Sequence, residues 1–480
     1  MFIPNHGLRL KRSWIFFLCL IVILGLALRL ASVYLGYSTV QDPERYEGQS
    51  GYAIWARNLL HGYGYGYGLN QPTAAMPPLP AILLAAVYYL FGEHNYIAVW
   101  LYKALLGTIT IVLTYLVGKK AFNEKVGLGA ASIVAFYPEL IIVDTHLQVH
   151  LNETPLVFFF ILTLYFFGRF VRTTSVFDLI WAGLSLGIAM LTHPSIWAFP
   201  IFAIIFLLIV YLRKQAMMFT AIVTGVTLLT VSPWLIRNYL IYGHLISSTS
   251  AAYVLFMGNN PQTQPHAYDT EKITGPSSPL KIWASMGGAN PKLIHGNYGW
   301  GEDEYKRYEA ANKYALNFII SQPVLFVQRG FGKVLDFWGS ERLFVAWYKD
   351  GYYSQNFPRG FFVILALAIM VSYSLVLLLG LEGIIFAQKS PYQYLILLPI
   401  LSLSLSSFIG QGHPKYHLTV VPVLAVFASW SVVNRSFIMQ SIKSSKRYFL
   451  LSLTPIFCLL FIWGREVILG DFNKFFILLK

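Results

Sequence analysis

The sequence predicts an all-α polytopic membrane protein with about 11 spans, interfacial helices and a loop domain on the outer face of the membrane. Its 480 residues are 56% hydrophobic and only 12% charged, and the mean hydropathy is +0.58. A soluble domain carries about 25% charged residues, so this chain has too little polar surface to cover a globule in water. The composition therefore excludes a soluble enzyme, a disordered chain and a nucleic-acid-binding domain.

Apolar runs follow one another along the whole chain, and a run of about 20 residues is enough to cross a bilayer. They lie at 14–36, 77–91, 96–118, 126–143, 154–168, 177–192, 194–212, 217–236, 359–381, 391–409, 417–433 and 448–464. The run 77–91 is short and follows Met76-Pro77-Pro78, a pattern that suits the start of a helix. We therefore expect a re-entrant or interfacial helix there and spans at the other runs.

The basic residues of the short loops set the orientation, because cytoplasmic loops carry an excess of lysine and arginine. Alternating spans place the following residues inside, together with the N-terminus: Lys119, Lys120, Lys125, Arg169, Arg172, Arg213, Lys214, Lys389, Arg435, Lys443, Lys446 and Arg447. If 77–91 did span, Lys119 and Lys120 would lie outside; the alternative that these two break the rule stays open. Most of the net charge of +14 is therefore explained by the orientation of the chain in a plasma or inner membrane.

This topology divides the chain into three parts. Residues 1–237 form an N-terminal transmembrane core that carries a first outer loop at 38–95. Residues 238–358 form an outer-face loop or cap, with a helical stretch at 303–338. Residues 359–480 form the C-terminal transmembrane helices. The cytoplasmic loops are short and contain no P-loop pattern, so any chemistry belongs on the outer (periplasmic) side and is not driven by ATP.

The first outer loop places carboxylates close to the membrane. Asp42 and Glu44 follow the first span, and an amphipathic stretch at 51–62 follows them. Carboxylates near a bilayer are costly, so they indicate a general base or a cation site; solvated loop charges are the alternative. The stretch 51–62 has Tyr52 and Trp55 on one helical face, which predicts a helix in the membrane interface.

The second outer loop carries a pattern that suits a metal ion. His146 and His150 are four residues apart, and Glu153 lies three residues further on, so a helix would present all three on one side. Two imidazoles and a carboxylate are ligands for zinc or a similar divalent ion. The alternative is a polar loop in which Glu153 stabilises a helix N-terminus.

Two basic residues lie where the positive-inside rule does not place them. Arg237 ends the run 217–236 at the outer interface, and Lys415 follows His413-Pro414 in an outer turn. A guanidinium and an ammonium at headgroup depth could hold a lipid phosphate from two sides. Ordinary snorkelling anchors are the alternative.

Several motifs, in order along nearly the whole chain, resemble the GT-C superfamily, and in particular its family-39-like members related to protein O-mannosyltransferases and lipid A aminoarabinose transferase. The pair formed by 233–239 (PWLIRNY) and 258–261 (GNNP) is the most specific. Residues 42–46 (DPERY) resemble the acidic first-loop motif, 56–65 (ARNLLHGYGY) resemble the stretch that follows it, and 76–80 (MPPLP) resemble a basic-Pro-Pro element. The chain departs from the pattern at Met76, where a basic residue is usual, and at Pro43, where an acid is usual.

The resemblance implies a GT-C fold and a glycosyltransferase that moves a hexosyl or pentosyl group from an undecaprenyl- or dolichyl-type phosphate to a lipid, glycan or protein acceptor. It implies that Asp42 is the catalytic base, with Glu44 as the second candidate. The substrate-binding residues that it implies are Arg237, Lys415, Tyr46, Glu153 and Asn259. No cofactor is implied with certainty, and a divalent metal at His146, His150 and Glu153 is the one cofactor that the residues suggest.

Two other functions remain open on the sequence. A flippase or transporter of a lipid-linked sugar would also be polytopic, although transporters often show internal repeats and interrupted helices in mid-membrane. We see no clear repeat between the halves, and the acids lie at the outer interface instead. A non-catalytic partner of a glycan-assembly machine is the other alternative.

Overall fold

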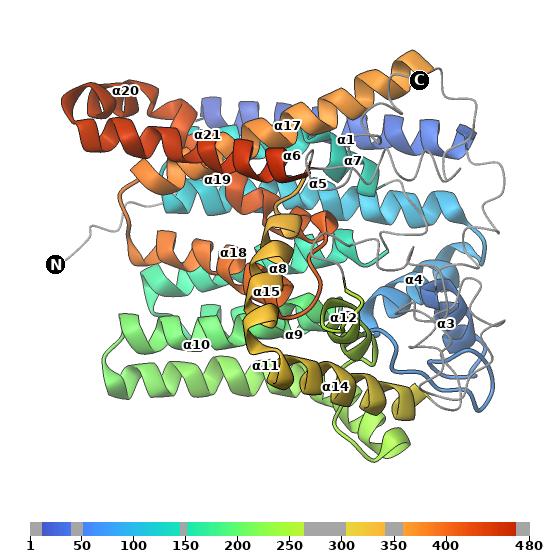
Figure 1. Cartoon of the computed structure of the whole chain (residues 1–480). Helices are drawn as coiled ribbons and strands as arrows, with labels where there is room; N and C mark the ends of the chain where they lie inside the picture. The colour runs from blue at the N-terminus through green and yellow to red at the C-terminus, as the bar shows by residue number, and fades with distance from the viewer. Residues whose placement is uncertain (1–11, 40–50, 145–150, 264–303, 341–358, 467–480) are drawn as a thin grey trace.

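The computed structural model describes residues 12–39, 51–144, 151–263, 304–340 and 359–466. These residues form helices joined by turns, without a β-sheet among them (Figure 1). The predicted all-α fold is therefore confirmed. Asp42, Glu44, Tyr46, His146 and His150 lie outside the described residues.

The first half of the chain contains α1 (Arg12–Thr39), α3 (Gly51–Leu60), α4 (Leu79–Phe91), α5 (Tyr96–Ala121), α6 (Glu124–Phe136), α7 (Pro138–Val143), α8 (Glu153–Thr173), α9 (Val176–Met190), the 3-10 helix η1 (Pro194–Ala198), α10 (Phe199–Val210) and α11 (Arg213–Tyr242). The second half contains α12 (Ser250–Gly258), α14 (Glu304–Ser321), α15 (Pro323–Phe337), α17 (Arg359–Phe386), α18 (Pro391–Ile409), the 3-10 helix η4 (Pro414–Val420), α19 (Val421–Val433), α20 (Arg435–Ser444) and α21 (Lys446–Glu466).

Every apolar run of the sequence forms a helix. Within the described residues, eight helices are long and apolar enough to cross a membrane, and shorter apolar helices lie at 79–91, 176–190 and 194–210. The run 126–143 was expected to be one span, but Pro138 divides it into α6 and α7. The chain is an integral membrane protein, and the number of about 11 spans stays a prediction.

The helix α4 agrees in length with the expectation that 77–91 does not span. Its 13 residues rise about 20 Å at 1.5 Å per residue, against a hydrocarbon core of about 30 Å. It packs beside α3 in a separate cluster of apolar side chains that includes Trp55, Leu84 and Trp100. As expected for an amphipathic helix, α3 buries Tyr52, Trp55 and Ala56 on one face.

The core of the bundle surrounds α19, which is buried along nearly its whole length between α17 and α6. Small residues allow the backbones to approach closely. A Cβ on Gly118 of α5 would lie 3.1 Å from the Cα of Gly127 in α6, and one on Gly383 of α17 would lie 2.2 Å from the carbonyl oxygen of Phe427 in α19. Such contacts are typical of helix packing in membranes.

The two ends of the bundle differ in charge. At one end, Arg172 of α8 donates to the carbonyl oxygen of Lys120 at the end of α5, and Arg169 pairs with Asp178 at 3.0 Å. The other end of α8 begins at Glu153, which faces Lys415 of η4. The basic loops that were predicted to be cytoplasmic therefore lie opposite the end that carries Glu153 and Lys415.

The described part of the predicted cap consists of α12, α14 and α15. The expected single helical stretch at 303–338 is broken at Gln322-Pro323, because proline cannot continue the hydrogen-bond ladder of a helix. The preceding helix also continues to Tyr242 rather than ending at 237. Asp336 of α15 pairs with Arg465 of α21 at 2.5 Å, so the end of the last helix lies against the cap.

Candidate active site

The predicted residues Glu153 and Lys415 lie together at one end of the bundle. Glu153 is the first residue of α8, and its Oε1 lies 3.9 Å from Nζ of Lys415. The carboxylate is nearly buried, with 7% of the side chain exposed, while 24% of the lysine side chain is exposed. A separation at the long limit of an ion pair still gives the ammonium a counter-ion.

Two matching His-Pro turns bring imidazoles to this pair. His193 precedes η1 and His413 precedes η4, and each ring accepts a hydrogen bond at Nδ1 from the backbone N–H two residues later, at 3.1 and 3.2 Å. A ring that accepts at Nδ1 is neutral with its proton on Nε2. Both rings pack on Tyr416, with centroids 5.4 and 5.9 Å from it.

Burial and the nearby ammonium of Lys415 lower the pKa of His193 to about 4. The folded protein therefore keeps His193 neutral at pH values at which the unfolded chain, with a pKa near 6.5, binds a proton. Because the unfolded state binds more protons between pH 6.5 and 4, the stability of the folded state falls as the pH falls through that window.

Replacing His193 by asparagine is expected to remove this pH dependence. Asparagine can still accept the hydrogen bond that caps η1, but it does not titrate. We expect the wild-type protein to lose up to about 3 kcal/mol more than His193→Asn between pH 6.5 and 4, which thermal unfolding in detergent measures. The exposed His244→Asn should follow the wild type, and equal losses in all three proteins would contradict this assignment.

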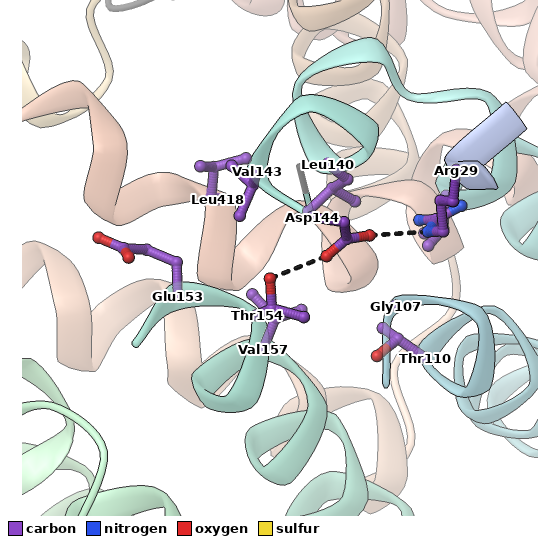
Figure 2. Close-up of a pocket in the computed structure, with 11 residues that line it drawn as sticks. Arg29, Gly107, Thr110, Leu140, Val143, Asp144, Glu153, Thr154, Val157 and Leu418 are labelled. Carbon is purple, nitrogen blue, oxygen red and sulfur yellow. Dashed lines mark hydrogen bonds and ion pairs between the residues drawn. The ribbon is translucent and has the colours of Figure 1, made fainter. Parts of the chain in front are cut away.

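Beside Glu153, a second carboxylate is held in a buried ion pair (Figure 2). Asp144 accepts a hydrogen bond at 2.7 Å from Nε of Arg29 in α1, and one at 2.8 Å from the hydroxyl of Thr154. A Cβ on Gly107 of α5 would lie 2.2 Å from Oδ2 of Asp144, so only glycine leaves room for the pair. A cavity of about 20 Å³, room for about one water molecule, adjoins these residues and Glu153.

Burial raises the pKa of Asp144 above its usual range, although Arg29, Thr154 and Lys103 act in the opposite direction. Lys103 is itself buried in α5 and donates to the carbonyl oxygen of Val143 at 2.7 Å. The end of α7 is thus fixed by two basic side chains from different helices.

Arg237 is hydrogen-bonded to the first outer loop. Its Nη1 donates to the carbonyl oxygen of Thr73 and its Nη2 to that of Tyr65, both at 2.6 Å. Nη1 also donates to the side chain of Asn238 at 2.8 Å. The guanidinium lies over the ring of Trp234, 4.9 Å from its centroid. These bonds leave the N–H of Nε and one N–H of Nη2 for a further acceptor.

Asn259 is completely buried and joins three elements. Its amide nitrogen donates to the carbonyl oxygens of Leu255 and Ile409, at 2.8 and 2.7 Å. Its oxygen accepts a hydrogen bond at 3.1 Å from Nζ of Lys333 in α15. Burial lowers the pKa of Lys333 to about 7, and Arg329 adds to the effect. These contacts brace α12 and α15 against the end of α18, and the substrate role of Asn259 stays a prediction.

Glu304, the first residue of α14, is buried against the first outer loop. It accepts hydrogen bonds from the hydroxyls of Thr249 (2.6 Å) and Thr73 (2.8 Å) and from the backbone N–H of Ala74 (3.0 Å). The hydroxyl of Tyr242 donates at 3.3 Å. Burial raises the pKa of Glu304, and these hydrogen bonds offset part of the rise.

Five residues of this region do not stand out in the sequence motifs: Arg29, Lys103, Asp144, His193 and Glu304. The sequence does contain a signal for Arg29 and Lys103: an ionisable residue inside an apolar span is energetically costly, which indicates that it has a partner. His146 and His150 of the predicted metal site lie outside the described residues. Among the described residues, no three His, Cys, Asp or Glu side chains gather as metal ligands, and Glu153 faces the ammonium of Lys415.

Comparisons with known proteins agree with this architecture. The family model of dolichyl-phosphate-mannose-protein mannosyltransferases matches residues 75–236, about a third of the chain. The match includes Glu153 and ends one residue before Arg237. No curated protein sequence matches the chain.

Several solved structures are similar to the chain. The archaeal oligosaccharyltransferase AglB from Archaeoglobus fulgidus, in complex with an inhibitory peptide and a dolichol-phosphate, is 15% identical with a TM-score of 0.51, over 94% of this chain and 55% of AglB. ArnT from Cupriavidus metallidurans bound to undecaprenyl phosphate is 15% identical with a TM-score of 0.43, over 90% of this chain and 80% of ArnT. The S. cerevisiae Pmt1-Pmt2 complex bound to the sugar donor is 16% identical with a TM-score of 0.37, over 51% and 36%.

The likeness to AglB concerns the fold, and the chain spans about half the length of that enzyme. It extends over nearly the whole of this chain, which the family model covers only in part. Together they support the resemblance that the motifs indicated: residues 75–236 are similar to the dolichyl-phosphate-mannose-protein mannosyltransferases, and the chain has a GT-C fold similar to that of AglB.

Proposed function

We propose that this protein is an integral membrane glycosyltransferase that transfers a sugar from a polyprenyl phosphate to a lipid, glycan or protein acceptor on the outer face of the membrane. The observation that carries the proposal is the GT-C fold with Lys415, Glu153 and His193 gathered at one end of its bundle. This end lies opposite the basic loops, which the positive-inside rule assigns to the cytoplasm. AglB was solved with a dolichol-phosphate and a peptide, which supports a lipid phosphate and an acceptor as partners.

In the proposed reaction, the carboxylate of Asp42 takes the proton of the acceptor hydroxyl or amine. The acceptor atom forms a bond to C1 of the sugar, and the bond between C1 and the phosphate oxygen breaks. The lipid phosphate leaves with that electron pair and gains negative charge. Lys415 stabilises this charge, and Arg237 can add the N–H groups that the first loop does not use. Glu44 is the second candidate for the base, and Tyr46 contacts the substrate.

Glu153 keeps Lys415 in place as its counter-ion, and the neutral ring of His193 lies beside both. The rigid spans that carry these residues fix their geometry, which favours transfer because the reacting atoms are oriented before reaction. A divalent metal at His146, His150 and Glu153 remains a separate proposal. The proposed reaction itself contains no step that depends on a metal.

Asp42→Asn is expected to abolish transfer, because an amide cannot accept the proton of the acceptor. We expect the release of undecaprenyl phosphate to fall by at least about a hundredfold. The assay uses the full-length protein in proteoliposomes with undecaprenyl-phosphate sugars and membrane extract as the source of acceptors, and mass spectrometry detects the product. Glu47→Gln, a matched change in the same loop, should retain activity.

Full activity of Asp42→Asn would show that Asp42 is not the base. A flippase is the alternative function, and it would move the intact lipid-linked sugar across the vesicle membrane without releasing undecaprenyl phosphate. The mass of the lipid product therefore distinguishes transfer from transport. Transfer to a lipid fraction free of protein would exclude a protein acceptor.

A further inference from the structure

The turn at residues 65–75, which we call the first-loop turn, is a compact structure next to α3. The backbone N–H of Tyr67 donates to the carbonyl oxygen of Gln71 at 2.9 Å, and that of Thr73 donates to Tyr65 at 3.2 Å. Asn58 of α3 donates to the carbonyl oxygen of Gly66 at 2.6 Å. A Cβ on Gly66 would lie 2.1 Å from the carbonyl oxygen of Gln71, so the two sides of the turn touch.

Two charged side chains hold the first-loop turn from outside it. Arg237, from the end of α11, donates to the carbonyl oxygens of Tyr65 and Thr73. Glu304, from the start of α14, accepts from the hydroxyl of Thr73 and the N–H of Ala74. The guanidinium donates to carbonyl oxygens of the turn, and the carboxylate accepts from its O–H and N–H groups. Both the acceptors and the donors of this short segment therefore have partners.

Glu304 also joins the turn to the segment that connects α11 with α12. The hydroxyl of Thr249 donates to Glu304 at 2.6 Å, while the backbone N–H groups of Thr249 and Ser250 donate to the carbonyl oxygens of Ala74 and Ala75 at 2.8 and 3.1 Å. Glu304 is 1% exposed. A carboxylate this deeply buried is costly unless donors surround it, and here four donors do so.

We propose that Glu304 is a positioning residue for sugar transfer: it fixes the first-loop turn to the cap, so that the transfer step depends on the cap. The inference rests on the proposed function, because the first outer loop carries the proposed base and Arg237 belongs to the proposed phosphate site. Loops of this kind are usually mobile, and a displacement of about 1 Å of a positioned group can cost a hundredfold in rate. Glu304 restricts the motion of the first-loop turn through four hydrogen bonds to three segments of the chain.

Hydrogen exchange tests the structural half of the proposal without using activity. In the full-length protein in detergent, Glu304→Ala is expected to lower amide protection at least tenfold in residues 65–76 and 248–252, and to leave α8 and α19 unchanged. Glu304→Gln keeps the shape of the side chain, and hydroxyl neighbours can rotate to suit an amide, so protection should stay within about threefold of wild type. Glu309→Ala changes an exposed glutamate of the same helix and serves as the matched control.

Release of undecaprenyl phosphate from an undecaprenyl-phosphate sugar tests the catalytic half. Per folded molecule, we expect kcat of Glu304→Ala to fall about tenfold to a hundredfold with a smaller change in KM. Glu304→Gln should restore kcat to within about threefold of wild type. Thr249→Val removes one donor and keeps the carboxylate, so it provides an intermediate case if Glu304→Ala does not fold.

Unchanged amide protection in Glu304→Ala would overturn the proposal, and so would lost protection with wild-type kinetic constants. A purely structural role would lower the amount of folded protein and leave kcat of the folded fraction unchanged, which would also overturn it. Failure of the proposed function looks different: the wild-type protein would release no undecaprenyl phosphate, while the exchange results would still stand.

Discussion

Replacing Lys415 by glutamine is expected to lower the rate of sugar transfer by about a hundredfold to a thousandfold, which is the usual effect of removing one group that stabilises transition-state charge. In the proposed mechanism, the ammonium of Lys415, which lies 3.9 Å from Glu153, faces the charge that forms on the departing phosphate. The loss should appear mainly in kcat, because that charge is greatest in the transition state. The release of undecaprenyl phosphate under saturating donor measures it.

A double change separates this catalytic effect from a loss of stability. Lys415→Gln removes the counter-ion of the nearly buried carboxylate of Glu153, which is destabilising. Adding Glu153→Gln removes the negative charge and with it this destabilisation. We expect Lys415→Gln/Glu153→Gln to recover thermal stability and to remain inactive. Lys415→Arg keeps the charge and should retain part of the activity, while Lys313→Gln, at an exposed lysine of α14, should have no effect. Recovery of activity in the double variant would contradict a direct role of Lys415.

Replacing Arg29 by methionine is expected to destabilise the protein by about 3–5 kcal/mol, the cost of leaving a buried charge without its partner. The two side chains are 1% and 3% exposed, and Nε of Arg29 lies 2.7 Å from Oδ2 of Asp144. The methionine fills much of the same volume and provides no donor. Without the guanidinium, the pKa of Asp144 should rise further, because burial is the largest influence on it. The apparent midpoint of thermal unfolding in detergent measures the loss.

Removing both charges tests whether the ion pair is the cause. Arg29→Met/Asp144→Asn should regain most of the lost stability, because an amide still accepts the hydrogen bond of Thr154 and carries no charge. Gly107→Val provides an independent check, since its side chain would occupy the position of Oδ2 of Asp144 and should destabilise the wild-type protein. If Arg29→Met is as stable as the wild type, the pair does not hold α1 against the end of α7.

Sequence patterns that depend on near neighbours predicted the helices well and their interruptions less well. Apolar runs mark helices because each run must bury its backbone polar groups in its own hydrogen bonds. The division of 126–143 at Pro138 and of 303–338 at Pro323 also had a local cause, the missing N–H of proline, and could have been read from the sequence. The predicted substrate-binding residues have different partners: Glu153 lies 3.9 Å from Lys415, whereas Arg237 is hydrogen-bonded to the first-loop turn.

The class of the molecule, an α-helical membrane protein with a GT-C-like fold and basic loops at one end, could be read from the sequence alone. Composition, the length of the apolar runs and the order of the motifs can be read from the sequence without knowing how the helices pack. Only the tertiary structure decided which charges share a partner. Arg29 reaches Asp144 across 115 positions, and Glu304 reaches Thr73 across 231. A buried charge is stable only beside a partner, and the packing of the helices decides which residues lie within a few ångströms of it. The separation of two residues along the sequence does not predict that distance.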